Sequence, residues 1–155
     1  MAEKITELNL KLKPLLSVSV VLLNICLFVL SLLPAVKADG YGASAFYFAA
    51  GGAGFHYWMI LLLPIAMVIA WVVLSGKDDM KLWVYIGMIV GVIADYSFWN
   101  MLKGFIEDHV YHAELAIGCK GSMTLLIVLG IVVLLQALLD YIPQLGKKTA
   151  VNKEA

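Results

Sequence analysis

The stretch from Leu82 to Glu114, LWVYIGMIVGVIADYSFWNMLKGFIEDHVYHAE, decides how the rest of the chain is interpreted. It begins as an apolar run and ends in the densest group of acids and histidines in the sequence. As a helix its roughly 33 residues would reach about 50 Å, whereas the hydrocarbon core of a bilayer is about 30 Å thick. We therefore expect this segment to cross a membrane and to project beyond it.

Small residues and one acid recur at every fourth position of this stretch. The series is Gly87, Gly91, Asp95 and Trp99. Residues four apart lie on one ridge of a helix, and small residues on such a ridge allow close contact between helices in a membrane. Gly87 and Gly91 are therefore predicted to be helix-packing residues, and the ridge is predicted to face protein.

The composition of the chain is typical of an integral membrane protein. Of its 155 residues, 63% are hydrophobic and only 14% are charged. The formal net charge is zero and every basic residue is a lysine, so no basic surface argues for nucleic acid as a partner. The expected partners are the lipid bilayer and other membrane protein subunits, in a hetero- or homo-oligomer.

Four apolar runs are long enough to cross a membrane. The predicted spans are residues 15–33, 55–75, 82–102 and 122–142. They predict an all-α fold, a polytopic four-transmembrane-helix bundle within one membrane domain of residues 1–155, with outer-side extensions of helices 2 and 3. The second apolar run is too long for one crossing, so either a long helix leaves the membrane or residues 44–54 form a separate interfacial or re-entrant piece. Gly51, Gly52 and Gly54 favour a break.

The polar turn at residues 76–81 is so short that the second and third spans must be antiparallel neighbours. Eight lysines lie in the N-terminal segment, this turn and the C-terminal tail, against three in the two opposite loops. The positive-inside rule then places both termini in the cytoplasm. Pro14 is expected to open the first helix, and Asp140 with Pro143 to end the fourth, leaving a polar tail.

Asp95 is the one acid inside an apolar span. A charge there is costly, so the carboxyl group is expected to be protonated, hydrogen-bonded or in contact with a water-filled cavity. Two interpretations follow: a structural hydrogen bond to the Ile60 carbonyl group, which Pro64 frees, or a role in proton coupling. We favour the structural one, because the spans contain no second ionisable relay group. The other intramembrane polar residues are Asn24, Asn100 and Gln136.

A possible metal site lies at the outer end of the third helix. The candidate ligands are Asp108, His109, His112 and His56. Asp108 and His112 are one helical turn apart, and carboxylate with imidazole suits Zn, Cu or Fe. His56 would approach from the neighbouring helix if the third helix bends at Gly104. A solvated polar helix end without any metal has the same composition.

The two cysteines are expected at different depths, so they are not expected to pair with each other. Cys26 lies inside the first span, and Cys119 lies beyond the outer end of the third. Cys119 is therefore expected either as an outer thiol, open to reagents, or paired with another chain.

Three classes of function remain after these steps. The first is a non-enzymatic integral membrane subunit that packs into and stabilises a larger membrane protein complex. The alternatives are an outer-side metal-binding component of a membrane oxidoreductase or oxygenase, and a small proton- or ion-coupled transporter. We favour the first and predict no catalytic residues, because an enzyme requires more paired polar groups and a transporter more intramembrane ones than this sequence offers.

Overall fold

The computed structural model describes residues 2–151, and the side chains of residues 11–141. In chain order the α-helices are α1 (Ala2–Leu32), α2 (Ala45–Ala50), α3 (Met59–Leu74), α4 (Lys81–His109) and α5 (Ile117–Val151). The 3₁₀ helices are η1 (Phe55–Trp58) and η2 (Asp78–Met80), and the strands are β1 (Pro34–Ala38), β2 (Tyr41–Ser44) and β3 (Glu114–Leu115).

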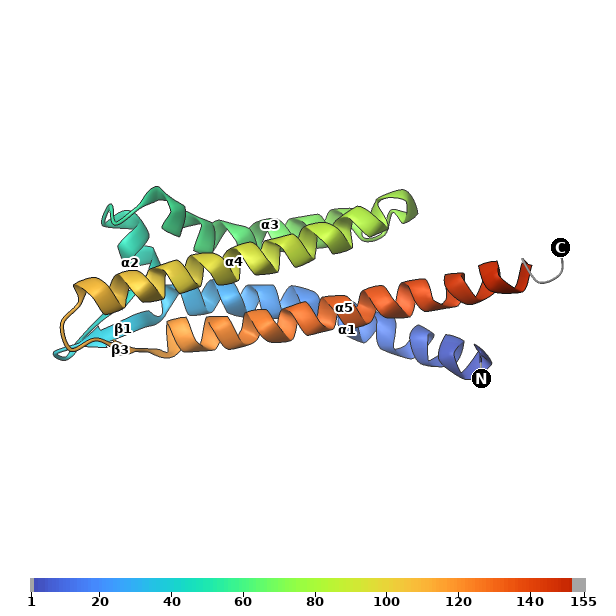
Figure 1. Ribbon diagram of the computed structural model, residues 1–155, viewed down its shortest axis with the longest axis horizontal. Helices are drawn as coiled ribbons and strands as arrows, with labels where there is room; N and C mark the ends of the chain where they lie inside the picture. Colours follow the sequence, from blue (N-terminus) through green and yellow to red (C-terminus); the bar gives the residue numbers. More distant parts are fainter. Residues whose placement is uncertain (1, 152–155) are drawn as a thin grey trace.

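The four long helices α1, α3, α4 and α5 form an antiparallel bundle (Figure 1). Each helix packs against two others, in the circular order α1, α3, α4, α5, so α1 and α4 occupy opposite corners. We call the end that carries the short strands and α2 the head, which comprises residues 33–58 and 110–116. The opposite end, where the two chain termini lie, is called the terminal end (Figure 1).

Four segments are long and apolar enough to cross a membrane, which confirms the prediction of a mostly helical chain with four candidate spans. They are Lys11–Leu32, Phe55–Leu74, Asp78–His109 and Ile117–Tyr141. Large apolar side chains are exposed along the outside of the bundle, among them Leu22, Val29, Ile69, Val90, Ile93 and Leu134. Such a continuous apolar exterior suits a surface covered by lipid rather than by water.

The ends of the first and last long helices differ from the prediction. α1 already begins at Ala2 and contains Pro14, and α5 continues past Asp140 to Val151. A proline removes one backbone hydrogen bond but does not end a helix whose flanking residues are good helix formers, as the Glu, Leu, Lys and Ala of these segments are. Residues 152–155 of the predicted tail lie outside the described residues.

The head contains a three-stranded antiparallel sheet with the order β2-β1-β3, which the all-α prediction missed. β1 and β2 form a hairpin around Asp39 and Gly40, both of which have positive φ angles, 48° and 84°. An Asp-Gly pair with positive φ at both positions is the preferred two-residue turn of a hairpin. β3 pairs with β1 on the other side and places Glu114 opposite Lys37.

The segment between the sheet and α3 is a short helix followed by a break, which is the second of the two arrangements expected for residues 44–54. Ser44 caps α2, because its hydroxyl oxygen accepts a hydrogen bond from the Tyr47 N–H at 3.2 Å. The chain then turns at Gly52, which has a φ of 79°, and enters η1. The outer extension expected for the second helix is therefore a separate helix, whereas α4 does extend without interruption to His109.

Candidate functional site

Among the described side chains, five polar ones are buried in the interior of the bundle. They are Asn24, Ser31, Asp95, Ser122 and Gln136. The first four are completely buried, and Gln136 is 3% exposed. Two of the five donate to a carbonyl oxygen of their own helix: Asn24 Nδ2 to Val20 at 2.8 Å and Ser31 Oγ to Phe28 at 2.6 Å.

Most oxygen atoms of this group have no hydrogen-bond partner among the described residues. The unpaired atoms are Asn24 Oδ1, Asp95 Oδ1 and Oδ2, Ser122 Oγ and Gln136 Oε1. The predicted hydrogen bond between Asp95 and the Ile60 carbonyl is therefore not formed. Buried polar atoms without partners are uncommon in folded proteins and frequently mark functional positions or bound water.

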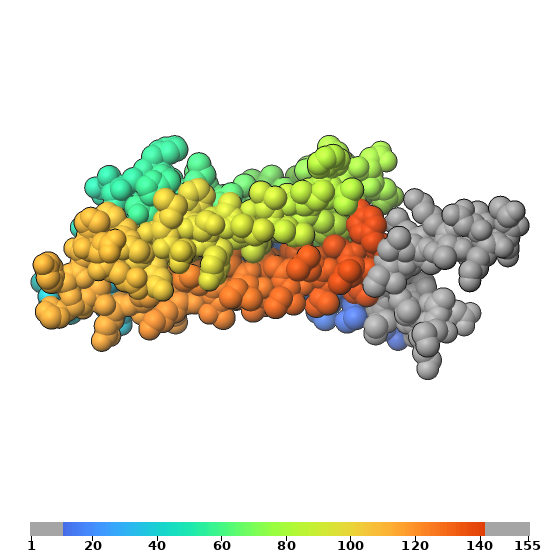
Figure 2. Space-filling view, in the orientation of Figure 1, coloured from blue at the N-terminus to red at the C-terminus, as the bar shows by residue number. Residues whose placement is uncertain are grey.

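Asp95 points into the bundle because it belongs to the buried face of α4. That face repeats every three or four residues and includes Val92, Trp99 and Leu102. On the face shown in Figure 2, the side chains of α4 and α5 meet along the seam between these two helices. The carboxyl group is thus enclosed by packed side chains and has no exposed surface.

The level of Asn24 in the bundle follows from two contacts between α1 and α5. Lys13 pairs with Asp140 at the terminal end, at 2.8 Å. Toward the head, a methyl group added at Gly121 would lie 3.3 Å from a carbon of Leu30. Because antiparallel helices advance by the same rise per residue, Asn24 lies opposite the part of α5 about eleven residues before Asp140, near Leu129.

The level of Asp95 follows in the same way from a contact between α4 and α5. A methyl group added at Gly130 would lie 3.5 Å from Val92. Asp95 is three residues further along α4, so it lies opposite about residue 127 of α5. Asn24 and Asp95 therefore occupy the same level of the bundle, to within about one helical turn, and project inward from opposite corners.

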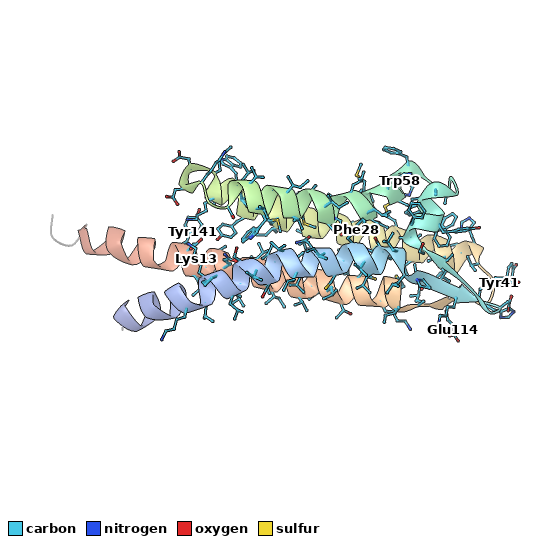
Figure 3. The ribbon with its side chains drawn as sticks, turned by 180° about the vertical axis from the view of Figure 1, so that it is seen from behind. Lys13, Phe28, Tyr41, Trp58, Glu114 and Tyr141 are labelled. Carbon is cyan, nitrogen blue, oxygen red and sulfur yellow. The ribbon has the colours of Figure 1, made fainter. Side chains whose placement is uncertain are left out.

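A second polar cluster, at the terminal end, connects three helices. Lys13 Nζ of α1 lies 2.8 Å from Asp140 Oδ1 of α5, and the Tyr85 hydroxyl of α4 donates to Asp140 Oδ2 at 2.6 Å. Figure 3 shows Lys13 and Tyr141 at this end of the bundle. The fourth helix is attached nearby, where Trp71 Nε1 donates to Ser17 Oγ at 3.0 Å.

This cluster surrounds a cavity of about 300 Å³, which we call the terminal pocket. Its lining residues are Lys13, Pro14, Ser17, Ser75, Lys81, Tyr85, Gln136 and Asp140. Sequence reasoning assigned Asp140 only to a helix end and missed the cluster. The available signal was that Lys13 and Asp140 flank the same end of the first and last spans.

The predicted metal ligands are not assembled into a site. In the part of the chain that the structure describes, no group of three or more His, Cys, Asp or Glu side chains lies close enough to hold a metal ion. His109 stacks on Phe105, with ring centroids 4.5 Å apart, and His56 packs against Tyr57 at 4.1 Å. His112 lies beyond the end of α4, in a turn with a φ of 53°.

The reason is that α4 runs through Gly104 as one helix to His109, without the bend that the predicted convergence required. Asp108 and His109 are exposed at the end of this helix. η1 packs against α4 one turn before His109, where the ring centroids of Tyr57 and Phe105 are 6.0 Å apart, but His56 and His109 each pack on an aromatic residue of their own helix. The Zn, Cu or Fe site predicted from these four residues is corrected accordingly.

The predicted glycine ridge divides into two different surfaces. A Cβ atom at Gly91 would lie 2.8 Å from Met67 Sδ, so the Met67 side chain of α3 packs against this glycine, as predicted for a packing residue. A Cβ atom at Gly87 would meet nothing within 4 Å. Gly87 instead opens into a shallow apolar groove of about 320 Å³ between α3 and α4, which also includes Ala70 and Trp83.

Both cysteines are free thiols, and Cys119 does not have the exposure expected of an outer thiol. Cys26 is exposed on the outside of α1, and Cys119 is completely buried near the start of α5. α5 begins earlier than predicted, at Ile117, and its first turn packs against the end of α1: a Cβ atom at Gly118 would lie 2.7 Å from the Leu33 carbonyl oxygen. Cys119 is therefore part of the core rather than of an outer loop.

Comparison with models of protein families, with curated protein sequences and with solved structures finds no match to this chain.

Proposed function

We propose that this chain is a non-enzymatic integral membrane subunit that packs into and stabilises a larger membrane protein complex. The observation that carries the proposal is the surface of the head, which combines exposed aromatic side chains with a free strand edge. The partners are other membrane protein subunits whose extramembrane segments reach the level of the head.

Four aromatic side chains of the head are largely exposed. They are Tyr41 (83%), Tyr47 (64%), Phe55 (77%) and Tyr111 (89%). They come from β2, α2, η1 and the link between α4 and β3, so different parts of the chain contribute to the same end. Figure 3 shows Tyr41 at the extreme tip, beyond the ends of the helices. Aromatic residues, Tyr in particular, contribute strongly to protein interfaces, since they bury a large area at low entropic cost.

The strand β2 forms one edge of the sheet and lacks the usual protection of such edges. Its sequence, Tyr41–Ser44, contains no charged residue and no proline. Natural proteins commonly protect edge strands with lysine, proline or a covering segment, because a free edge can pair with a strand of another chain. The edge of β2 is thus available for main-chain hydrogen bonds with a partner.

A groove of about 560 Å³ lies between this hairpin and α2. Its lining residues are Leu32, Pro34, Gly42, Ser44, Phe46, Tyr47, Ala50 and Gly51. Leu32 is the last residue of α1, so the groove begins where a candidate membrane span ends. A partner that leaves the membrane beside α1 would reach the groove and the strand edge together.

The experiment compares intact-complex masses after extraction from native membranes in a mild detergent. We expect the wild-type chain in an assembly heavier than the isolated chain, and we expect Tyr41→Lys with Tyr111→Ala to release it. The matched control is Ile93→Ala, which truncates an exposed apolar side chain on the bundle rather than on the head. A wild-type chain that is extracted alone, or head variants that stay in the assembly, would contradict the proposal.

We also propose that both termini lie in the cytoplasm and the head outside. This follows from the lysine asymmetry of the sequence, which has eight lysines in its N-terminal segment, the turn at residues 76–81 and its C-terminal tail, and three in the two opposite loops. Because Cys119 is buried, the test requires new thiols: Tyr41→Cys on the head and Lys77→Cys in the turn before η2. An impermeant thiol reagent added outside intact cells is expected to label only Tyr41→Cys. Labelling of Lys77→Cys alone would reverse the orientation.

A further inference from the structure

At about one level in the middle of the bundle lie three oxygen atoms that have no hydrogen-bond partner among the described residues. They are Oδ1 of Asn24 and both carboxyl oxygens of Asp95. The two residues are completely buried, and the helix contacts described above place them at one level, on helices at opposite corners. The surrounding core at this level is apolar and includes Leu27, Leu126 and Leu129.

No counter-charge for Asp95 is present at this level among the described residues. α3 contains no ionisable side chain. On the other elements around Asp95 the titratable groups lie toward the two ends of the bundle, apart from Cys26 and Tyr96, which are exposed on its outside. These groups are Lys11, Lys13, His56, Tyr57, Asp78, Asp79, Lys81, Tyr85, Lys103, Glu107, Asp108, His109, Cys119, Lys120, Asp140 and Tyr141.

The unpaired carbonyl oxygen of Asn24 can form a hydrogen bond with Asp95 only when Asp95 is neutral. A protonated carboxyl group offers one O–H donor, whereas a carboxylate offers acceptors alone. The amide nitrogen of Asn24 donates one of its two N–H groups to Val20, and the atom of this side chain that has no partner is its carbonyl oxygen, an acceptor. A carboxylate facing that oxygen would be a buried, uncompensated charge, and such charges are strongly unfavourable inside a membrane protein.

We propose that Asp95 and Asn24 form an internal proton-binding site, in which Asp95 carries a proton and donates it in a hydrogen bond to Asn24 Oδ1, directly or through one water molecule. The ligand is a proton rather than a metal cation. The two side chains together supply three oxygen atoms, whereas cations such as Ca²⁺ require about six to eight. The site is independent of the head and so of the proposed assembly.

The test is infrared spectroscopy of the purified chain in lipid nanodiscs over a range of pH. A protonated carboxyl group has a carbonyl stretching band separate from those of carboxylates and amides. We expect this band at neutral pH in the wild type, its disappearance at alkaline pH, and its absence from Asp95→Asn, which keeps the shape of the side chain. Asn24→Leu is expected to shift the band, because the hydrogen bond is lost. Asn100→Leu, at an exposed position of α4, is the matched control and is expected to leave it unchanged.

A second measurement uses the wild type alone and does not depend on the folding of any variant. A hydrophobic carbodiimide reacts with protonated carboxyl groups inside membranes, and peptide mass spectrometry locates the adduct. We expect an adduct on Asp95 at neutral pH and its loss at alkaline pH. The proposal is overturned if neither the band nor the adduct is found at neutral pH, or if Asn24→Leu leaves the band unchanged. It is also overturned if sodium chloride, compared with choline chloride, removes both signals at neutral pH, because the site would then bind a metal cation.

Discussion

Replacing Asp140 by alanine is expected to loosen the terminal end of the bundle. The Asp140 side chain is only 7% exposed and joins α1, α4 and α5 through Lys13 and the Tyr85 hydroxyl. In Asp140→Ala the Tyr85 hydroxyl, which belongs to a residue that is 4% exposed, loses its acceptor inside the protein. The substitution therefore removes the carboxylate acceptor and leaves the buried Tyr85 hydroxyl without it.

The structure allows the size of this effect to be worked out. A hydrogen bond to a charged acceptor contributes about 1.5–3 kcal/mol. The Lys13 side chain is 42% exposed, so water replaces much of its ion pair, which we discount to less than about 1 kcal/mol. Together these give a loss of about 1.5–4 kcal/mol, or a decrease of roughly 3–16 °C in melting temperature for a chain of this size.

The assay is a thermal unfolding scan in nanodiscs at one fixed heating rate. Asp140→Asn is the matched variant. It keeps an oxygen acceptor for Tyr85 but gives up the ion pair and the negative charge of the acceptor, so it is expected to lose about 1–2 kcal/mol. Tyr85→Phe completes a double-mutant cycle with Asp140→Ala, and a coupling of about 1 kcal/mol or more is expected between the two sites. Equal losses in Asp140→Ala and Asp140→Asn, or strict additivity with Tyr85→Phe, would refute the reasoning.

Two further predictions concern the glycine ridge and the cysteines. Gly91→Leu is expected to lower the free energy of unfolding by about 1–3 kcal/mol through overpacking against Met67, whereas Gly87→Leu, which enters open space, is expected to change it little. Equal melting temperatures for the two variants would contradict the packing of Met67 against Gly91. A membrane-permeant thiol reagent is expected to label Cys26 in the folded protein and Cys119 only after denaturation, because Cys26 is exposed and Cys119 is buried. Intact mass counts the labelled thiols. Rapid labelling of Cys119 without denaturant would show that the start of α5 is not packed as described.

Some features of the fold could be predicted from the sequence because they are local. About twenty consecutive apolar residues form a candidate span whatever they pack against. Gly51, Gly52 and Gly54 break the helix because glycine has greater backbone freedom than other residues. The hairpin also has a local signal, the Asp39-Gly40 pair. β3, with only two residues, had none, because it is a strand only by virtue of pairing with β1.

The candidate site was only half predictable for a related reason. Asp95 and Asn24 could be selected one at a time, since a polar residue within an apolar run stands out by itself. Their common level depends on how α1 and α4 are each registered against α5, which no short-range pattern encodes. The same limitation produced the error about His56, His109 and His112, whose convergence required a bend that the straight packing of α4 does not provide.

The sequence by itself determined that this chain has four apolar helices and an isolated acid in the third, because composition alone shows these features. It also determined that the second and third helices are antiparallel, because the turn between them is short. Only the tertiary structure decided that Gly91 contacts α3 while Gly87 does not, that Cys119 is in the core, and that Asp140 joins three helices. These depend on the rotation and axial shift of each helix relative to its neighbours. The rotation and the axial shift are set by the packing of many side chains at once. A shift of one residue, or a rotation of about one hundred degrees, alters every contact of a helix but leaves its hydropathy the same.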